Sequence, residues 1–462
     1  MGFVDDQSGA VFKQLDYDVV LEEPVLVKPS TEAACLNTSP LFLSNFEQGL
    51  AFTVETVYIY GAVADKGNEK VADVMKAALV KALDHYDILG GRMKLNDVEN
   101  RIEINRNYKG AQFATASCNA TVAELGDLNI PHPFFRKFVP QAHNVSTVED
   151  VPLMMIQVTT FQCGGFAIGF GMSHLLWDGI GCFEFFMNLV SFARGGEAVY
   201  TPKFDRTMLK ARNPPTPKYD HPEYISLDKL SPGFKAGTFT KPETAKAEFE
   251  AIAASQNCIT KTIPFTLQEL TALKKQAMED GVLSKTSTFE VVSGHVWQAR
   301  TKALELEPTH VATLMYAVDI RKRLQPNLPA EFCGNGVYSA CARATCLELQ
   351  TSSPSFPVKK IQEANDIVTE DYIRSALDWW EVYRGVPPII GDTFYMTSWL
   401  KMPFYSIDFG WGTPLYSGPV ASQMVEFIVL FPNGKNDGGI NLILSLPPPV
   451  MAKFEQYVKV RL

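Results

Sequence analysis

Residues 164–194 constrain the fold more than any other stretch, because a buried strand and a helix follow one another there with a histidine between them. Residues 166–172 are apolar or small throughout, which predicts a strand covered on both faces. After Gly181, apolar side chains recur every three or four residues, which predicts a helix. His174 lies where the strand passes into the loop. A rigid position of this kind in an α/β layer is typical of catalytic groups.

The same alternation of strands and helices fills two halves of the chain, and a proline-rich segment lies between them. Residues 202–242 carry seven prolines, a density that neither a helix nor a sheet tolerates. A connection of that length is typical of a crossover between domains. We therefore expect a first domain at 1–201, a crossover linker at 202–250 and a second domain at 251–462. The expected strands include 52–60, 101–106, 153–161, 259–265, 311–319, 336–343, 393–399, 425–431 and 439–445, and the expected helices include 69–86, 357–376, 449–458 and two that open at capping boxes at Thr266 and Ser287.

The charge and the N-terminus argue against several classes of function. With 42 Lys and Arg against 51 Asp and Glu, the formal net charge is −9, which disfavours a general nucleic-acid or anionic-membrane surface. The start, MGFVDDQSGA, lacks the basic and apolar regions of a secretory signal, and no apolar run approaches the roughly 20 residues of a membrane span. The eight cysteines include no Cys-x-x-Cys pair, so reduced thiols are expected. We predict a soluble, cytoplasmic protein and a monomer.

Two short motifs, far apart in the chain, carry a family resemblance. Residues 174–179 read His-Leu-Leu-Trp-Asp-Gly, and residues 408–412 read Asp-Phe-Gly-Trp-Gly. The first motif alone is weak, but the two motifs in this order and at this separation are specific. The chain resembles the plant BAHD acyltransferases along nearly all of its length.

The resemblance implies an α/β fold of two similar-sized domains, each a mixed sheet flanked by helices, with an active-site channel between them. The first domain carries His174 and the second carries the Asp-Phe-Gly-Trp-Gly loop. It also implies that acyl-CoA is a co-substrate, that no cofactor is permanently bound and that no metal is needed. The acceptor would be a small-molecule alcohol or amine.

His174 is the candidate general base. Acyl transfer from a thioester needs a base for the proton of the attacking group, donors for the developing oxyanion and exclusion of water. A neutral imidazole has a pKa near operating pH, and the activated thioester makes a covalent enzyme intermediate unnecessary.

Asp178, four residues further on, invites the interpretation of a triad in which it orients the imidazole. The resemblance implies instead that this carboxylate points away from the channel and pairs with an arginine. Arg321 is the candidate partner and Arg323 the alternative. Gly179 is expected to allow a backbone conformation that a Cβ would block.

The second motif is expected to support the fold. It offers one carboxylate, Asp408, and no nucleophile. Gly410, Trp411 and Gly412 form a run typical of a turn. The resemblance agrees, since it implies a loop that is distant from the base and supports the fold or the coenzyme end.

Candidate binding residues lie at several places. Ser284, Lys285 and Ser287 stand at a helix N-terminus, which has the character of a phosphate site, although ordinary helix caps explain them equally well. The resemblance implies that Thr397 helps to hold the thioester oxygen and that Trp399 walls the site, with core packing as the alternative for Trp399.

Two further candidates lie in loops. Arg384 belongs to a loop that helps to choose the acceptor in similar enzymes. Gln48 ends the polar turn 43–48 and is a candidate contact for a substrate.

Other segments resemble one subgroup, the hydroxycinnamoyltransferases of suberin and cuticle that act on ω-hydroxy fatty acids and fatty alcohols. Those segments are 43–48, 161–166, 205–207, 211–215 and 415–421. The apolar loop of Leu175, Leu176 and Trp177 suits a long-chain acceptor, unless these side chains face the core.

We predict a transferase that moves a feruloyl or coumaroyl group from CoA to a long-chain ω-hydroxy fatty acid or fatty alcohol, in a ternary complex with His174 as the base. The alternatives are hydroxycinnamoyl or benzoyl transfer to another alcohol or amine, such as shikimate, and a non-catalytic family member that assists lipid elongation. A serine hydrolase would need Gly-x-Ser-x-Gly, whose second glycine is missing after Ser173. A metal enzyme would need a third ligand beside His174 and Asp178, and none stands nearby in the sequence.

Overall fold

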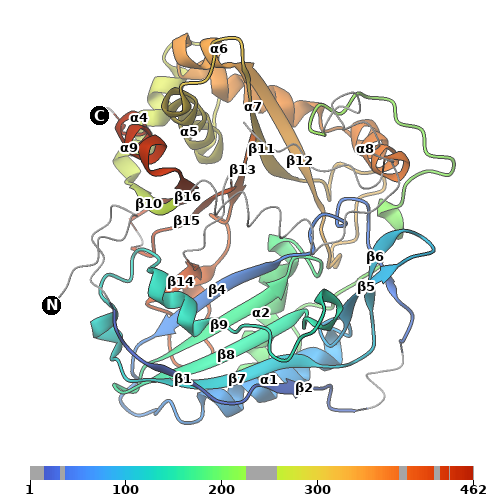
Figure 1. Cartoon of the computed structure of the whole chain (residues 1–462), viewed down its shortest axis with the longest axis vertical. Coiled ribbons are helices and arrows are strands. Elements are labelled where there is room, and N and C mark those ends of the chain that lie inside the picture. The colour runs from blue at the N-terminus through green and yellow to red at the C-terminus, as the bar shows by residue number, and fades with distance from the viewer. Residues whose placement is uncertain are drawn as a thin grey trace.

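The computed structural model describes residues 15–31, 37–224, 258–383, 393–420, 427–435 and 437–460. Its two large sheets are mixed, helices pack against each of them, and the two layers are stacked along the longest axis of the molecule (Figure 1). The predicted α/β fold of two domains with mixed sheets is confirmed. Among the described residues, no helix is both long enough and apolar enough to span a membrane.

The first sheet contains the strand that leads to His174. Its order is β1-β7-β8-β9-β4-β14, and β2 also pairs with β7. The strands are β1 (Val19–Leu21), β2 (Val25–Val27), β4 (Thr53–Tyr60), β7 (Ala111–Cys118), β8 (Met154–Phe161), β9 (Phe166–Ser173) and β14 (Tyr416–Pro419). Every residue of β9 is buried, because α1 (Val71–His85) and α2 (Gly179–Ala193) cover one face while η3 (Pro133–Phe138) packs against the other.

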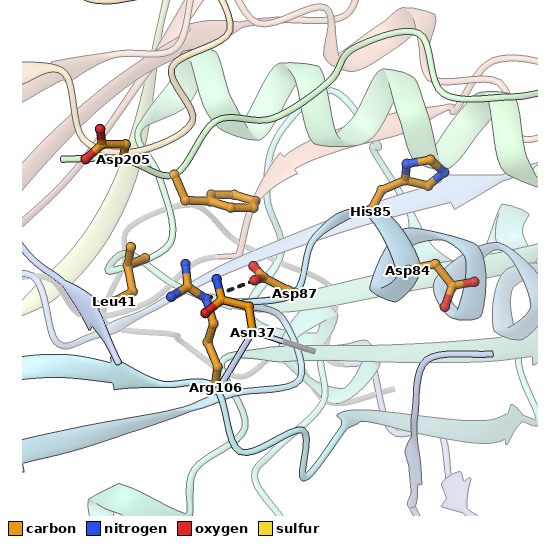
Figure 2. A pocket seen from close by; sticks show the side chains of 8 residues that line it. Asn37, Leu41, Asp84, His85, Asp87, Arg106 and Asp205 are labelled. Atoms are coloured by element: carbon orange, nitrogen blue, oxygen red, sulfur yellow. Dashed lines mark ion pairs between the residues drawn. The ribbon is translucent and has the colours of Figure 1, made fainter. Parts of the chain in front are cut away.

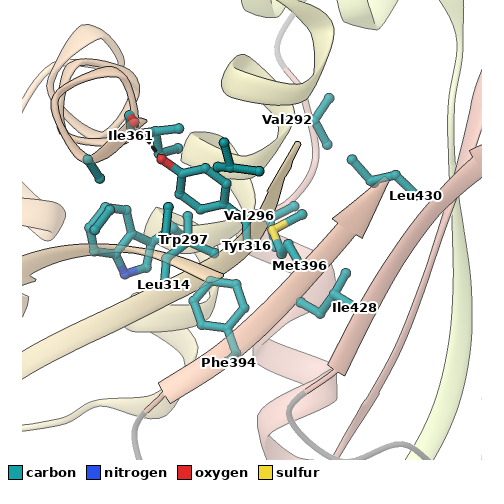
Figure 3. Packing of buried hydrophobic residues seen from close by; sticks show 14 of the residues in the cluster. Val292, Val296, Trp297, Leu314, Tyr316, Ile361, Phe394, Met396, Ile428 and Leu430 are labelled. Carbon is teal, nitrogen blue, oxygen red and sulfur yellow. Dashed lines mark hydrogen bonds between the residues drawn. The ribbon is translucent and has the colours of Figure 1, made fainter. Parts of the chain in front are cut away.

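The second sheet has the order β10-β16-β15-β13-β11-β12. Its strands are β10 (Ile259–Phe265), β11 (Val311–Asp319), β12 (Val337–Thr345), β13 (Thr393–Ser398), β15 (Phe427–Pro432) and β16 (Ile440–Leu446). The described helices of this half are α4 (Leu267–Met278), α5 (Thr288–Leu304), α6 (Cys346–Thr351), α7 (Ser355–Ile367), α8 (Glu370–Val382) and α9 (Pro448–Tyr457). The core between helices and sheet is aromatic at its centre, where Trp297 and Phe394 lie near Tyr316, whose hydroxyl donates to the carbonyl of Ile361 at 2.6 Å (Figure 3).

A small sheet and several short 3-10 helices complete the described structure. The small sheet has the order β3-β6-β5 and consists of β3 (Leu41–Phe42), β5 (Arg92–Asn96) and β6 (Arg101–Asn105). The other 3-10 helices are η2 (Val122–Leu125), η4 (Val148–Asp150), η5 (Thr207–Leu209) and η7 (Phe404–Ser406).

The C-terminal half of the chain contributes one strand to the first sheet. β14 runs antiparallel to β4, with Gly418 opposite Val57. The proposed division at 1–201, 202–250 and 251–462 therefore stays a prediction, and residues 225–257 of the linker and its flank lie outside the described part of the chain.

Two expected boundaries were wrong. The predicted helix at 357–376 is two helices, α7 and α8, because the first helix ends at Ile367 and Thr369 caps the second one by accepting from the N–H of Tyr372. The helix expected after Gly181 begins at Gly179, because Asp178 caps it.

Candidate active site

His174 directly follows β9, as the sequence predicts. Its backbone N–H donates to the carbonyl of Phe52 at 2.9 Å, which continues the pairing of β9 with β4. The Phe52 ring lies against the imidazole, with 5.2 Å between the ring centroids. Since His174 is half-buried, the sheet fixes its position while part of the residue stays accessible.

The surroundings of the imidazole favour its neutral form. Burial lowers the pKa of His174 below its ordinary value, and the charge of Asp178 opposes this effect without reversing it. Nδ1 is enclosed by protein and has no hydrogen-bond partner among the described residues. The nitrogen available to a substrate is therefore Nε2, which acts as a base when the proton of the neutral ring is on Nδ1.

The carboxylate of Asp178 is engaged away from the imidazole. Its Oδ1 accepts from the N–H groups of Ile180 and Gly181 at 3.0 and 3.3 Å, which caps α2. Arg321 donates to both oxygens, at 2.7 and 2.9 Å, and the N–H of Gly336 donates to Oδ2 at 2.9 Å. The predicted ion pair with Arg321 is present, and these bonds occupy the carboxylate.

Arg323, the alternative partner of Asp178, binds the end of α7 instead. It donates to the carbonyls of Asn365 and Val368 at 2.7 and 2.9 Å, which closes the C-terminal end of α7. The geometry therefore favours a structural role for Asp178 over a triad with His174.

Of the two glycines that follow Asp178, only Gly181 lies where a side chain would clash. A Cβ on Gly179 would meet only the sulfur of Met402, at 3.6 Å, so the expectation that Gly179 avoids a steric block was wrong. A Cβ on Gly181 would lie 2.7 Å from the Cβ of Trp177. The first turn of α2 packs against the loop that precedes it, so no side chain larger than a hydrogen atom fits at Gly181.

The apolar loop before α2 belongs to the core. Leu175, Leu176 and Trp177 are 1%, 0% and 4% exposed, and the Trp177 ring stacks on Phe185 with 4.9 Å between centroids. The suggestion that this loop suits a long-chain acceptor was wrong, because its side chains fill the layer between the first sheet and its helices.

The loop of the second motif, residues 408–412, packs against the first sheet and its helix α2. Asp408 accepts from the N–H groups of Gly410 and Gly412 at 2.7 and 2.9 Å, and from Arg194, the C-cap of α2, at 2.9 Å. Both glycines have positive φ, at 107° and 85°, which L side chains rarely adopt.

Trp411 is the anchor of this loop. Its indole N–H donates to the carbonyl of Gly67 at 3.1 Å, the ammonium of Lys66 lies 3.9 Å from its ring centroid, and Phe166 packs edge-on at 5.7 Å. These contacts hold the loop against β9 and are those of a scaffold.

The candidate donor-binding residues surround the start of α5. Ser287 accepts from the N–H of Glu290 at 3.2 Å as its N-cap, while Ser284 and Lys285 are exposed. Beside them is a cavity of about 300 Å³ lined by Lys274 of α4, Thr288 and, among others, Leu267, Leu400 and Ile440. Their contact with coenzyme A stays a prediction.

The candidates that the family resemblance places near a channel lie on β13 and directly after it. Thr397 and Trp399 are half-buried, and the Trp399 ring packs against Phe404 with 5.7 Å between centroids. Gln48 bonds through its amide to Ile102, accepting at 2.7 Å and donating at 3.2 Å. Arg384 lies outside the described residues.

A separate cavity of about 550 Å³ lies near the end of α1 and contains none of the predicted site residues (Figure 2). Asp87 pairs there with Arg106 at 2.9 Å, and Asp84 accepts from Ser30 at 2.6 Å. In the part of the chain that the structure describes, no group of three or more His, Cys, Asp or Glu side chains is arranged to hold a metal ion.

One residue that contacts His174 was not among the predicted site residues. The side-chain amide of Asn335 donates to the backbone carbonyl of His174 at 2.9 Å. Because 161 positions separate the two residues, no local pattern connects them.

Comparisons with known proteins find relatives along nearly the whole chain. A family model described as the Transferase family matches residues 18–460. The chain is 33% identical to Omega-hydroxypalmitate O-feruloyl transferase of Arabidopsis thaliana, over 96% of this chain and 93% of that protein. It is 31% identical to Fatty alcohol:caffeoyl-CoA acyltransferase of the same plant, over 95% of this chain and 97% of that protein. Among solved structures, vinorine synthase matches with a TM-score of 0.71 and 20% identity, over 94% of this chain and 96% of that one.

Proposed function

We propose a substrate pair and a mechanism for this chain, which belongs to the Transferase (BAHD) family and is an acyl-CoA-dependent acyltransferase. The proposed donor is a hydroxycinnamoyl-CoA carrying a feruloyl or coumaroyl group. The proposed acceptor is the terminal hydroxyl of a long-chain ω-hydroxy fatty acid, or a fatty alcohol. The names of the two relatives support this choice, since one acts on omega-hydroxypalmitate and the other on a fatty alcohol.

The observation that carries the mechanism is the half-buried His174, with its pKa lowered by burial and its Nδ1 enclosed. Nε2 takes the proton of the acceptor hydroxyl while the hydroxyl oxygen attacks the thioester carbonyl. The carbon–sulfur bond then breaks, and the proton passes to the departing CoA thiolate. Both substrates are bound at once, and no acyl-enzyme forms.

The oxyanion that develops on the thioester oxygen needs a donor. The proposed donor is the hydroxyl of Thr397, at the half-buried end of β13. Trp399 would then form a wall that excludes water. A general base typically contributes 10²–10⁴-fold, which sets the scale for His174.

The phosphates of coenzyme A would bind at the N-terminus of α5. Ser284, Lys285 and Ser287 are exposed there, and Lys274 lines the neighbouring cavity with Thr288. Free N–H groups at a helix N-terminus attract anions, and lysines add charge.

Release of free CoA thiol tests the proposal. Purified protein is mixed with feruloyl-, coumaroyl-, benzoyl- or fatty acyl-CoA, each crossed with 16-hydroxypalmitate, a fatty alcohol, shikimate and an amine, and thiol release is followed with a thiol reagent. Fastest turnover is expected for a hydroxycinnamoyl-CoA with 16-hydroxypalmitate or the fatty alcohol. A preference for shikimate or for an amine would overturn the acceptor.

Two histidine variants separate catalyst from accessory protein. His174→Ala should lower turnover about 10²–10⁴-fold. His85→Ala is the matched control, because this exposed histidine ends α1 and stacks on Phe192. Equal turnover in both variants would overturn the role of His174, and no thiol release from any pair would favour a non-catalytic member.

A further inference from the structure

The ring of Phe52 lies against the imidazole of His174, and the proposed mechanism does not use it. β4 and β9 run antiparallel with Thr53 opposite Ser173. Phe52 and His174, the next residues along, therefore also face one another, and the N–H of His174 donates to the carbonyl of Phe52 at 2.9 Å. Side chains of directly opposite residues share one face of a sheet. The strand register thus pairs the two rings, whose centroids are 5.2 Å apart.

This pair of rings stands where one face of the sheet emerges from the core. Met172, two residues before His174 on the same face, is 3% exposed, and its partner Val54 is half-buried. At the next pair His174 is half-buried and Phe52 is 39% exposed. A single exposed apolar side chain is ordinary on a protein surface, but this one lies against the proposed base and can contact whatever binds there.

The base of an acyltransferase needs protection from water. Nδ1 of His174 is enclosed, so Nε2 is the nitrogen that a small molecule can reach. A water molecule at Nε2 would be activated in the same way as the acceptor hydroxyl. Its oxygen would attack the thioester carbonyl, the carbon–sulfur bond would break, and its proton would pass through Nε2 to the CoA thiolate. The products would be the free acid and CoA thiol, so the activated acyl group would be lost.

The Phe52 ring offers an apolar cover that the charged neighbours of His174 do not. Asp178 and Glu47 act on the imidazole through their charge, and carboxylates are strongly hydrated wherever water can reach them. The Phe52 ring has only C–H groups to present to water. Its backbone is held on both sides, since its N–H donates to the carbonyl of Leu50 at 2.8 Å and its carbonyl accepts from His174. The ring is therefore fixed beside the base.

We propose that Phe52 is a specificity residue that keeps water from the general base, so that the enzyme transfers its acyl group to an alcohol and does not hydrolyse the thioester. The apolar carbons next to an acceptor hydroxyl pack on the exposed part of the ring, whereas water gains no such contact. Trp399 is the proposed wall beside the thioester, and Phe52 covers the base itself. This inference rests on the proposed role of His174.

The ratio of hydrolysis to transfer tests the inference. Each variant is mixed with feruloyl-CoA and 16-hydroxypalmitate, or with the pair from the panel above that the wild type turns over fastest, and the free acid and the ester are quantified by chromatography. In Phe52→Ala the ratio of acid to ester should rise about 10-fold. That is the lower end of the range for burial of a whole phenylalanine side chain, because part of this ring is already exposed. Phe52→Leu, which keeps an apolar cover, should change the ratio by less.

Phe183→Ala is the matched control. Phe183 is a half-buried phenylalanine of α2, and its ring packs on Tyr200, with 6.0 Å between the centroids. This variant should keep the wild-type ratio of acid to ester. The ratio is a readout that a purely structural role would not move, because a destabilised enzyme forms less of both products. Phe52→Ala combined with His174→Ala should lose the added hydrolysis, since Nε2 activates the water that enters.

The outcomes distinguish this inference from the mechanism on which it depends. If His174→Ala keeps its transfer activity, the mechanism fails. If His174→Ala is inactive but Phe52→Ala has the wild-type ratio of acid to ester, only the inference fails. Added hydrolysis that persists in the double variant would also overturn the inference, because water would then attack without the base. Across Phe52→Leu, Phe52→Val and Phe52→Ala the ratio should rise as the side chain shortens. An unchanged ratio in the members that fold, checked by a thermal unfolding scan, would contradict the role of the ring.

Discussion

Asp178→Asn is expected to destabilise the protein while leaving the chemistry of His174 in place. The substitution removes the main charge that neutralises Arg321, whose side chain is 11% exposed. Asp319, the other carboxylate beside this guanidinium, is 3.4 Å away and 49% exposed, so it compensates little. Leaving one member of a buried ion pair alone costs about 3–5 kcal/mol. Asparagine still caps α2, so the cap adds little to this loss. At about 2–4 °C per kcal/mol for a unit of about 150–250 residues, the thermal midpoint should fall by roughly 6–20 °C.

The assay pairs a thermal unfolding scan with turnover measured well below the midpoint of the variant. We expect kcat within a few-fold of the wild type, because none of the hydrogen bonds of Asp178 reaches His174. Asp178→Asn combined with Arg321→Met should recover much of the lost midpoint, since replacing both members of a buried pair is often neutral.

The opposite pattern would refute this reasoning. Loss of a carboxylate that orients a catalytic histidine lowers kcat by about 10⁴-fold. Such a fall in kcat in Asp178→Asn, with an unchanged thermal midpoint, would mean that Asp178 orients the imidazole of His174 and does not serve mainly to neutralise Arg321.

Three other outcomes follow from single features of the site. Because burial lowers the pKa of His174 below 6.5 and only the neutral ring accepts a proton, kcat/KM should be level above pH 6.5 and fall as the pH drops through the lowered pKa; a rate that rises on acidification would contradict this. Gly181→Ala should cost about 1–3 kcal/mol of unfolding free energy, because the new Cβ would lie 2.7 Å from Trp177, whereas Gly179→Ala should be nearly neutral, and denaturant titrations compare the two. Trp411→Ala should cost about 3–5 kcal/mol, measured in the same way, and a lost kcat at full stability would refute its scaffold role.

The position of His174 could be predicted because its signals are local. An unbroken apolar run gives a strand that is buried on both faces, and β9 is one. The residue that follows it must lie at the end of that strand, between the ends of its two neighbours. The capping box at Ser287 was equally predictable, since the helix start depends on four consecutive residues.

The loop after His174 shows where local pattern fails. Three apolar residues in a row are compatible with a ligand pocket and with the core, and the distinction depends on what packs against them. Here Phe185 of α2 stacks on Trp177. The break between α7 and α8 was missed for a related reason, because the apolar spacing continues across Thr369.

Local patterns could not predict the network of three buried residues beside His174, in which Glu47 accepts hydrogen bonds from Arg206 and Asn335. Glu47 is separated from Arg206 by 159 positions and from Asn335 by 288. Each residue alone reads as a surface polar residue. Only the fold, which brings three loops to one place, shows that they compensate one another inside the protein.

The pairing of β14 with β4 limits how far the two layers can move apart. β4 pairs with β9 on one side and with β14, from the far end of the chain, on the other. A wide hinge motion would have to break the hydrogen bonds between β14 and β4, so separating the two layers in this way would cost the pairing of these strands. The first 200 or so residues made alone would also leave the β4 edge bare, a template for aggregation, so the halves of this enzyme are not separable modules.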